Sequence, residues 1–304
     1  MLAIVIPYYK INFFEETLES LVCQTDKRFK VYIGDDASPE DPSYLIAKYK
    51  YKFEFKYNKF NTNLGSSSLV KQWHRCIDMI QDERWIMILG DDDFLSENVV
   101  EEFYKNEEFY NNTNVIRFAS CKINEKTERI SDVYKNPKIE LATDFLFRKT
   151  RSSLSEHIFK KNKVDEIRFK NFPLAWFSDV LAIMEFADFK NIFSINEAIV
   201  YVRISNISIS GSKNNEVLKA KATFEFYFYL LSKKASYFSE IQIIELLNKF
   251  KRVYFNNKKS ISDLFKISYL YLSNYWISKY IIFLKELVLV FFRTKDNASR
   301  IKPI

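Results

Sequence analysis

The chain has 304 residues, of which 47% are hydrophobic and 17% aromatic, so it can bury a substantial core and is not an intrinsically disordered protein. Residues 212–304 contain 17 Lys and Arg against 7 Asp and Glu, a net charge of +10. The whole chain has 46 Lys and Arg and 39 Asp and Glu, so residues 1–211 contain 29 Lys and Arg against 32 Asp and Glu, a net charge of −3. This division locates the basic character in the C-terminal third, where a basic, aromatic segment can meet nucleic acid or anionic lipid.

The three cysteines and the N-terminus indicate a reducing compartment. Cys23, Cys76 and Cys121 are odd in number and lie far apart, which argues against a disulfide framework and against a cysteine zinc site. Met1 leads directly into an apolar strand pattern without a basic segment, so we expect no signal peptide.

Strand and helix patterns alternate through the first two thirds of the chain. Apolar runs predict strands at residues 2–8, 29–33, 53–57, 85–89 and 115–121. Helical spacing predicts helices at residues 13–23, 44–51 and 69–80. This alternation is typical of an α/β fold with a mostly parallel sheet flanked by helices.

After Gly211 the strand patterns end and three helices are predicted, at residues 216–231, 241–255 and 262–292. We therefore expect two domains, an α/β domain at residues 1–211 and a basic, aromatic helical region at residues 212–304. Lys213-Asn214-Asn215 is the expected boundary between them.

Two of the four glycines come at a strand end directly before acidic residues. Gly34 precedes Asp35-Asp36, and Gly90 precedes Asp91-Asp92-Asp93. Ligands of open α/β sheets bind at the carboxyl ends of the strands. In an extended segment Asp91 and Asp93 point the same way and can hold one Mg²⁺ or Mn²⁺ together with substrate phosphates. Two simpler explanations stay open, a turn at Asp35-Asp36 and an acidic approach to a helix N-terminus at residues 91–93.

Five short segments occur in the order and spacing of a known family: Ile4-Val5-Ile6-Pro7-Tyr8-Tyr9, Gln24-Thr25, Asp35-Asp36-Ala37-Ser38, Asn63-Leu64-Gly65 and Leu89-Gly90-Asp91-Asp92-Asp93. The set resembles the inverting family 2 glycosyltransferases, which have the GT-A (Rossmann-like) fold. The resemblance covers about the first 210 residues and leaves the helical C-terminal extension outside it.

The resemblance implies a role for each matching residue. Asp36, with Asp35 beside it, falls where the family contacts the base or ribose of the donor. Pro7 and Tyr8 fall where the first strand abuts the base. Asp93 falls at the metal-ligand position, with Asp91 as its partner, and Asp92 falls where it can touch the donor sugar or ribose.

Two later segments extend the resemblance and also depart from it. Phe172-Pro173-Leu174-Ala175-Trp176-Phe177-Ser178-Asp179 is similar to a family segment that ends in Glu-Asp, in which the Asp is the catalytic base. Asp179 matches, whereas Ser178 replaces the Glu. Residues 201–210 are similar to the family's Tyr-Arg-x-His segment, in which Arg203 matches and Ser205 replaces the His. Arg203 is expected to pair with donor phosphate through its two-pronged guanidinium. From the residues alone, Asp179 can equally be a first-turn Asp favoured by a helix dipole, and Arg203 a member of an ordinary ion pair.

The resemblance implies an inverting, metal-dependent transfer of a sugar from a nucleotide-diphosphate donor to a saccharide or lipid-linked saccharide acceptor, in cell-surface polysaccharide synthesis. Asp179 would take the acceptor proton as the acceptor attacks the sugar. The substitutions Ser178 and Ser205 keep open a catalytically weakened donor-binding or scaffolding protein of an assembly complex. A pyrophosphorylase and a dehydrogenase are disfavoured, because no glycine-rich loop follows the first strand. Only two histidines occur, His74 and His157, which argues against a triad hydrolase and a histidine zinc site.

The predicted helix at residues 262–292 is almost wholly apolar, but no uninterrupted apolar run reaches the roughly 18 residues of a spanning helix. Basic residues among aromatic ones favour a helix lying on an anionic membrane surface, and the absence of a recognition motif argues against nucleic acid. We therefore expect a cytoplasmic protein, peripheral on the inner face of the plasma membrane. Burial of this helix against the catalytic domain or a partner subunit is the alternative.

Overall fold

The computed structural model describes residues 1–110, 113–148, 153–205, 215–257 and 260–299, with side chains described as far as residue 290. The chain divides into two compact units, Met1–Asn214 and Asn215–Ile304. The expected boundary after Gly211, its residues Lys213 and Asn214, and the second half of the 201–210 segment all lie outside the described residues.

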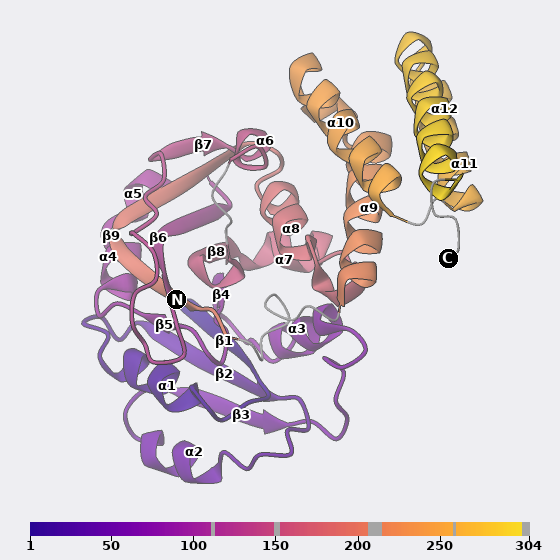
Figure 1. Cartoon of the computed structure of the whole chain (residues 1–304). Coiled ribbons are helices and arrows are strands. Elements are labelled where there is room, and N and C mark those ends of the chain that lie inside the picture. The colour runs from indigo at the N-terminus through magenta and orange to yellow at the C-terminus, as the bar shows by residue number, and fades with distance from the viewer. Residues whose placement is uncertain (111–112, 149–152, 206–214, 258–259, 300–304) are drawn as a thin grey trace. The chain divides into compact units, whose positions relative to one another are not determined.

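The first unit is built on a nine-stranded sheet in the order β3-β2-β1-β4-β8-β6-β9-β5, with β7 paired to β9 (Figure 1). Its strands are β1 (Leu2–Tyr8), β2 (Phe29–Asp35), β3 (Phe55–Lys59), β4 (Trp85–Ile88), β5 (Phe94–Leu95), β6 (Val115–Ile123), β7 (Ile139–Leu141), β8 (His157–Lys160) and β9 (Asn191–Arg203). The pairings make β1, β2, β3, β4, β6 and β9 run in one direction, whereas β5, β7 and β8 run in the other. The sheet is therefore mostly parallel, as predicted.

The helices of this unit are α1 (Phe14–Val22), α2 (Ser43–Tyr49), α3 (Leu69–Ile77), α4 (Val99–Lys105), α5 (Glu107–Tyr110), α6 (Ala142–Phe145), α7 (Lys161–Ile167) and α8 (Ser178–Phe186). Alternate residues of β1 decide which helices cover which face. Leu2, Ile4, Ile6 and Tyr8 belong to one core cluster with the buried residues of α1, α2 and α4. Helix α3 contacts β1 and β2 without contributing to that cluster, so it packs on the opposite face.

Strand β9 is the longest in the sheet and was not predicted from the sequence. It runs parallel to β6 with a register shift between Phe118 and Ala119, and it pairs antiparallel with β5 and β7. Its end at Arg203 lies beside the turn that follows β4, because the backbone N–H of Arg203 donates to the carboxylate of Asp93 at 2.8 Å. The strand therefore connects the far side of the sheet with the acidic cluster.

The second unit consists of α9 (Glu216–Lys233), α10 (Glu240–Asn256), α11 (Ile261–Ser273) and α12 (Ile277–Ser299). The prediction of one helix over residues 262–292 was wrong. The helix ends after Ser273, and Tyr275 adopts φ 55°, a left-handed conformation that an α-helix cannot continue. Within the described residues we find no helix whose length and hydropathy would let it cross a bilayer.

Candidate active site

The carboxyl ends of the central strands open into a cavity of about 670 Å³ in the first unit. Seven of the predicted site residues line it: Pro7, Asp36, Asp91, Asp92, Asp93, Asp179 and Arg203. These residues come from five separate places in the chain, and the parallel strand order brings them to one edge of the sheet.

The acidic cluster after β4 is a turn and not the extended segment that we expected. The N–H of Asp93 donates to the carbonyl oxygen of Gly90 at 3.3 Å, which closes the turn. A Cβ added to Gly90 would lie 2.9 Å from Asp92 Oδ1 and 3.1 Å from Asp93 Oδ2, so both carboxylates fold back over this glycine. Gly90 is thus required because the carboxylates occupy the space of a side chain.

Main-chain groups hold two of the three carboxylates in place. Asp91 Oδ2 accepts the backbone N–H groups of Tyr9 and Lys10, each at 2.8 Å, which fastens the turn to the end of β1. Asp93 accepts the N–H of Arg203 on Oδ1 and the hydroxyl of Ser155 on Oδ2, at 2.8 and 2.5 Å. The Ser155 oxygen also accepts the Gly90 N–H at 3.1 Å, so Ser155 bridges both ends of the turn.

Burial raises the pKa of all three carboxyl groups. It raises the pKa of Asp91 to about 7, with the negative charge of Asp92 as the next cause. Burial and the charge of Asp92 likewise raise the pKa of Asp93, and burial raises that of Asp92. Three crowded carboxylates that oppose one another's ionisation are an environment that a divalent cation would relieve.

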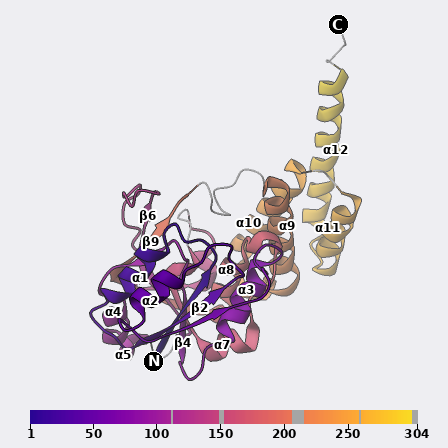
Figure 2. The same ribbon diagram turned by 90° about the horizontal axis from the view of Figure 1, so that it is seen from below.

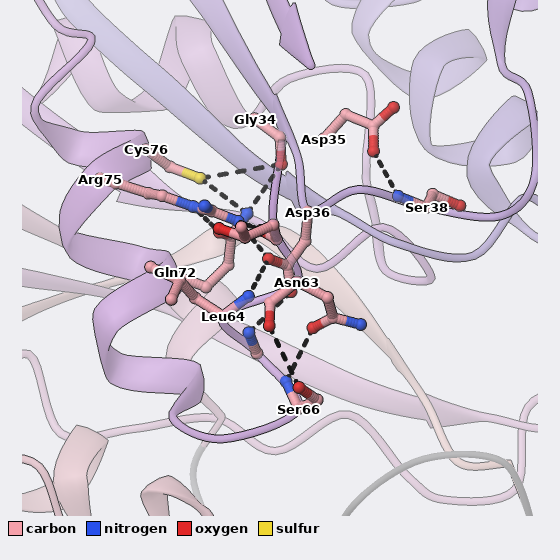
Figure 3. A network of polar contacts seen from close by, with 12 residues as sticks. Gly34, Asp35, Asp36, Ser38, Asn63, Leu64, Ser66, Gln72, Arg75 and Cys76 are labelled. Carbon is pink, nitrogen blue, oxygen red and sulfur yellow. Dashed lines mark hydrogen bonds and ion pairs between the residues drawn. The ribbon is translucent and has the colours of Figure 1, made fainter. Parts of the chain in front are cut away.

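Asp36 also lines the cavity and organises the 63–66 loop (Figure 3). Its Oδ1 accepts the N–H of Leu64 at 2.7 Å and its Oδ2 accepts that of Gly65 at 2.8 Å. The guanidinium of Arg75, on α3, forms an ion pair with the same carboxylate and donates to the carbonyl oxygen of Thr62 at 2.8 Å. Asp36 is 4% exposed, and its carboxylate is held by Leu64, Gly65 and Arg75.

Tyr8 and Asp35 do not line the cavity. They are register partners on β1 and β2, and both belong to the sheet face that α1, α2 and α4 cover. The ring of Tyr8 packs 4.6 Å from that of Phe14, and Asp35 accepts the Tyr57 hydroxyl at 2.6 Å and the Ser38 N–H at 2.7 Å. Strand alternation thus turns Tyr8 into the core and leaves its neighbours Pro7 and Tyr9 at the cavity.

Asp179 lies in the first turn of α8, after a segment with unusual backbone geometry. Leu174, Ala175 and Phe177 adopt φ values of 59°, 54° and 67°, which non-glycine residues rarely do. Ser178, which replaces the family's Glu, is fully buried, and its hydroxyl accepts the N–H of Phe172 at 3.2 Å. The serine therefore closes a strained loop that lines the cavity directly before Asp179.

The guanidinium of Arg203 is committed to contacts inside the protein. Nε donates to the carbonyl oxygen of Asp92 at 3.0 Å, and Nη1 to that of Asn124 at 2.8 Å. Nη2 pairs with Glu16 at 2.7 Å, and the side chain is 0% exposed. The predicted contact of this guanidinium with phosphate would require these bonds to be exchanged. Ser205, in place of the family's His, is buried at the end of the described part of this segment.

Residues 3–193, well over half of the chain, match the family model described as Glycosyl transferase family 2. The chain belongs to this family. Solved structures that share its fold include TarS 1–349 from S. aureus in complex with UDP-GlcNAc, at 14% identity and a TM-score of 0.63 over 85% of this chain and 73% of that chain. The complex of the same TarS residues with UDP matches at 14% identity and a TM-score of 0.61, over 85% and 72%. TarS in a longer form matches at 14% and 0.61, over 84% of this chain and 43% of that chain. The sequence has no significant match among curated proteins.

Two residues of this family 2 glycosyltransferase that contact the site were not predicted from the sequence. Ser155 is 62 positions from its partner Asp93, and Arg75 is 39 positions from Asp36. Ser155 follows residues that carried no motif, whereas the position of Arg75 on a predicted helix beside the loop 63–65 could have suggested a partner for Asp36.

The glycosyltransferase fits a divalent cation by the chemistry of its oxygen donors. Among the described residues, no group of three or more His, Cys, Asp or Glu side chains is arranged so that it could hold a metal ion. A turn with a few carboxylates suits a cation that takes one or two protein oxygens and completes its shell with water and phosphate.

Proposed function

We propose that this family 2 glycosyltransferase transfers a sugar, with inversion, from a nucleotide-diphosphate donor to a saccharide or lipid-linked saccharide acceptor in cell-surface polysaccharide synthesis. The observation that carries the proposal is that Asp36, the acidic turn at residues 90–93 and Asp179 line one and the same cavity. The complexes of TarS with UDP-GlcNAc and UDP support a uridine-linked sugar as the first donor to test.

The donor would lie across the ends of β1, β2 and β4. Asp36 and Pro7 would contact the base and ribose, since both line the cavity beside the 63–66 loop. Asp93 and Asp91 would hold Mg²⁺ or Mn²⁺, and Asp92, whose carboxylate folds over Gly90, would contact the donor sugar or ribose. The cation, when bound, supplies charge neutralisation for the leaving diphosphate. We assign Arg203 to positioning the turn, because its guanidinium is bonded to the Asp92 carbonyl and to Glu16.

Asp179 would act as the general base. Its carboxylate takes the proton from the acceptor hydroxyl while the acceptor oxygen forms a bond to C1 of the sugar. The bond from C1 to the phosphate oxygen breaks with its electrons on the nucleotide diphosphate, so no covalent enzyme intermediate is needed. The strained loop at residues 172–178 would hold Asp179 at the acceptor side of the cavity.

Transfer by purified full-length protein, with a panel of nucleotide sugars and Mn²⁺, tests the proposal. We expect Asp93→Ala and Asp179→Asn each to lower turnover by about 1,000-fold or more, with thermal unfolding preserved. Excess EDTA should abolish activity, and added Mn²⁺ should restore it. Near-wild-type turnover of either variant would remove that residue from the mechanism, and full activity in EDTA would remove the metal.

The same assay separates the enzyme from a donor-binding scaffold. A scaffold would be stabilised thermally by a nucleotide sugar and yet show neither transfer nor donor hydrolysis.

For the basic second unit, we propose an anionic membrane surface as partner, on the cytoplasmic face of the plasma membrane.

A further inference from the structure

The α11–α12 hairpin presents an apolar side to solvent. On α11, Ile261, Phe265, Tyr269 and Leu272 are 74%, 72%, 65% and 51% exposed. On α12, Ile277, Ile281, Leu284 and Val288 are 47%, 49%, 38% and 52% exposed. Both sets recur at three- and four-residue spacing, so each forms one stripe along its helix. We call these eight residues the outer face.

The opposite side of the hairpin is already covered within the second unit. Ile267 and Leu270 of α11 and Phe283 of α12 are 0% exposed. Phe283 stacks 5.8 Å from Tyr271 of α11 and lies 6.1 Å from Tyr254 of α10. Figure 2 shows α11 and α12 side by side, next to α9 and α10. Because the inner sides of both helices face α9 and α10, the two outer stripes share the side that points away from them.

Charges around the hairpin are distributed unevenly between its two sides. The acidic residues of the two helices whose side chains are described, Asp263 and Glu286, pair with Lys266 at 3.6 Å and with Lys251 of α10 at 2.9 Å. Glu286 therefore lies on the inner side of α12. Lys285 is exposed on α12 between Ile281 and Leu289, among residues of the outer side. Residues 260–304 contain seven Lys and Arg and three Asp and Glu.

The exposed apolar stripes and the basic charge together indicate which partner would cover the outer face. A second copy of the chain would bring together two units that each carry a net charge of +10 over residues 212–304. An anionic bilayer offers the opposite charge, and its interface accepts Phe, Tyr and aliphatic side chains beside a lysine. Charge complementarity therefore favours lipid over self-association.

We propose that the outer face lies in the headgroup region of an anionic lipid bilayer, with Phe265 and Ile281 reaching the acyl boundary and Lys285 meeting lipid phosphate. The α11–α12 hairpin would then lie along the surface, with α9 and α10 on the side away from the lipid. This inference deepens the membrane partner of the proposed function by naming the surface that makes the contact, and it does not depend on the chemistry of the cavity.

Flotation of the full-length protein with vesicles tests the proposal. The probes are vesicles of phosphatidylcholine alone and of phosphatidylcholine mixed with phosphatidylglycerol. We expect binding to the mixed vesicles only, and a weakening by about tenfold in each of Phe265→Glu and Ile281→Glu. Lys285→Glu should weaken binding as well, through the loss of charge attraction. Tyr51→Glu is the matched control, because Tyr51 is 89% exposed in the first unit and should bind as the wild type does.

Three results would overturn the proposal. They are equal binding to both kinds of vesicle, wild-type binding by Phe265→Glu and Ile281→Glu, and light scattering that shows a dimer which Phe265→Glu converts to a monomer. The last result would assign the outer face to self-association. Thermal unfolding within about 2 °C of the wild type would establish that a variant is folded. Sugar transfer to a water-soluble acceptor should be unchanged in all four variants, so a failure of the chemistry is distinguishable from a failure of lipid binding.

Discussion

At the scale of single residues, Asp36 combines a structural and a binding position. Its carboxylate fixes the loop through the N–H groups of Leu64 and Gly65 while the residue lines the cavity. Gly65 is part of the same arrangement, because a Cβ at this position would lie 2.5 Å from Asp36 Oδ2. A closer contact than van der Waals packing permits would force either the loop or the carboxylate to move.

We therefore expect Gly65→Ala to raise the KM for the nucleotide-sugar donor by about tenfold, with a smaller change in kcat. Steady-state kinetics with the donor varied at saturating acceptor would measure this. Asn61→Ala, at an exposed position of the same loop, is the control and should leave the KM unchanged. An unchanged KM in Gly65→Ala would show that Asp36 keeps its place or does not contact the donor.

His157 is a second residue whose surroundings make a measurable prediction. It is 0% exposed, its Nδ1 lies 2.9 Å from the carbonyl oxygen of Ser153, and its Nε2 has no hydrogen-bond partner among the described residues. Burial, followed by the charge of Arg117, lowers its pKa to about 3. The folded protein therefore keeps His157 neutral at pH values where the unfolded chain, with an ordinary pKa of about 6.5, binds a proton.

The lowered pKa predicts a loss of stability on acidification. Above about pH 6.5 His157 is neutral in both states and has no effect; between about pH 6.5 and 3 the unfolded state gains the proton and is favoured. His157→Phe keeps a ring against Phe159 and removes the titration. Urea unfolding should show that the wild type loses about 2 kcal/mol more than His157→Phe between pH 7 and pH 5. Parallel losses in the two proteins would contradict the buried neutral imidazole.

At the scale of elements, the end of β9 is bonded to the turn after β4. The backbone N–H of Arg203 binds Asp93, its Nε binds the Asp92 carbonyl, and its Nη2 binds Glu16 of α1. These bonds hold the end of β9 against the turn that carries the cavity carboxylates, although Arg203 and Asp93 are 110 residues apart in the sequence. The side chain of Arg203 therefore fixes the position of the turn whose carboxylates line the cavity.

Arg203→Lys should therefore lower the free energy of unfolding of the donor-free protein by about 3 kcal/mol, since a lysine cannot satisfy the carbonyl oxygens of Asp92 and Asn124 together. Urea unfolding without donor would measure this loss. A phosphate ligand would behave differently, with unchanged stability and a raised donor KM. The exposed ion pair of Arg168 with Asp78 supplies the control, because Arg168→Lys should lose less than about 1 kcal/mol.

Local sequence patterns were sufficient for the elements that carry strong periodicity. The strands β1, β2, β3, β4 and β6 and the helices α1, α2 and α3 were predicted within a few residues, and so was the mostly parallel sheet. Strand β9 escaped prediction because Ser194, Asn196 and Glu197 interrupt its apolar residues, although pairing on both sides stabilises it. The turn at Gly90–Asp93 was not predicted because it depends on hydrogen-bond donors to its carboxylates. Tyr9 and Lys10 supply these donors to Asp91, and Ser155 supplies one to Asp93. Those donors come from other parts of the chain, which no local pattern reports.

At the scale of the whole molecule, charge is segregated by unit. The second unit carries the basic excess, with a net charge of +10 over residues 212–304, whereas residues 1–211 carry −3. Electrostatic attraction to an anionic surface falls with ionic strength, because the Debye length shortens from about 10 Å at 0.1 M salt to about 3 Å at 1 M.

Because of this segregation, we expect the rate of sugar transfer to depend on salt when the acceptor is embedded in an anionic membrane but not when it is free in solution. Transfer to an acceptor embedded in phosphatidylglycerol-containing vesicles should fall several-fold between about 0.05 and 0.5 M NaCl. Transfer to a water-soluble acceptor analogue should stay nearly constant over the same range. An equal fall with both acceptors would place the salt effect in the cavity.

The bonds from Asp91 to the N–H groups of Tyr9 and Lys10 have a consequence for how this enzyme can acquire a new sugar specificity. They join carboxylate to main chain, so substitutions of Tyr9 and Lys10 leave the donors present and the acidic turn in register with β1. The lining residues 174–177 come from the separate loop before α8 and differ widely in side-chain size. Mutational libraries aimed at Leu174 and Trp176 should therefore change which sugar is accepted, while the acidic turn keeps its main-chain bonds to the end of β1.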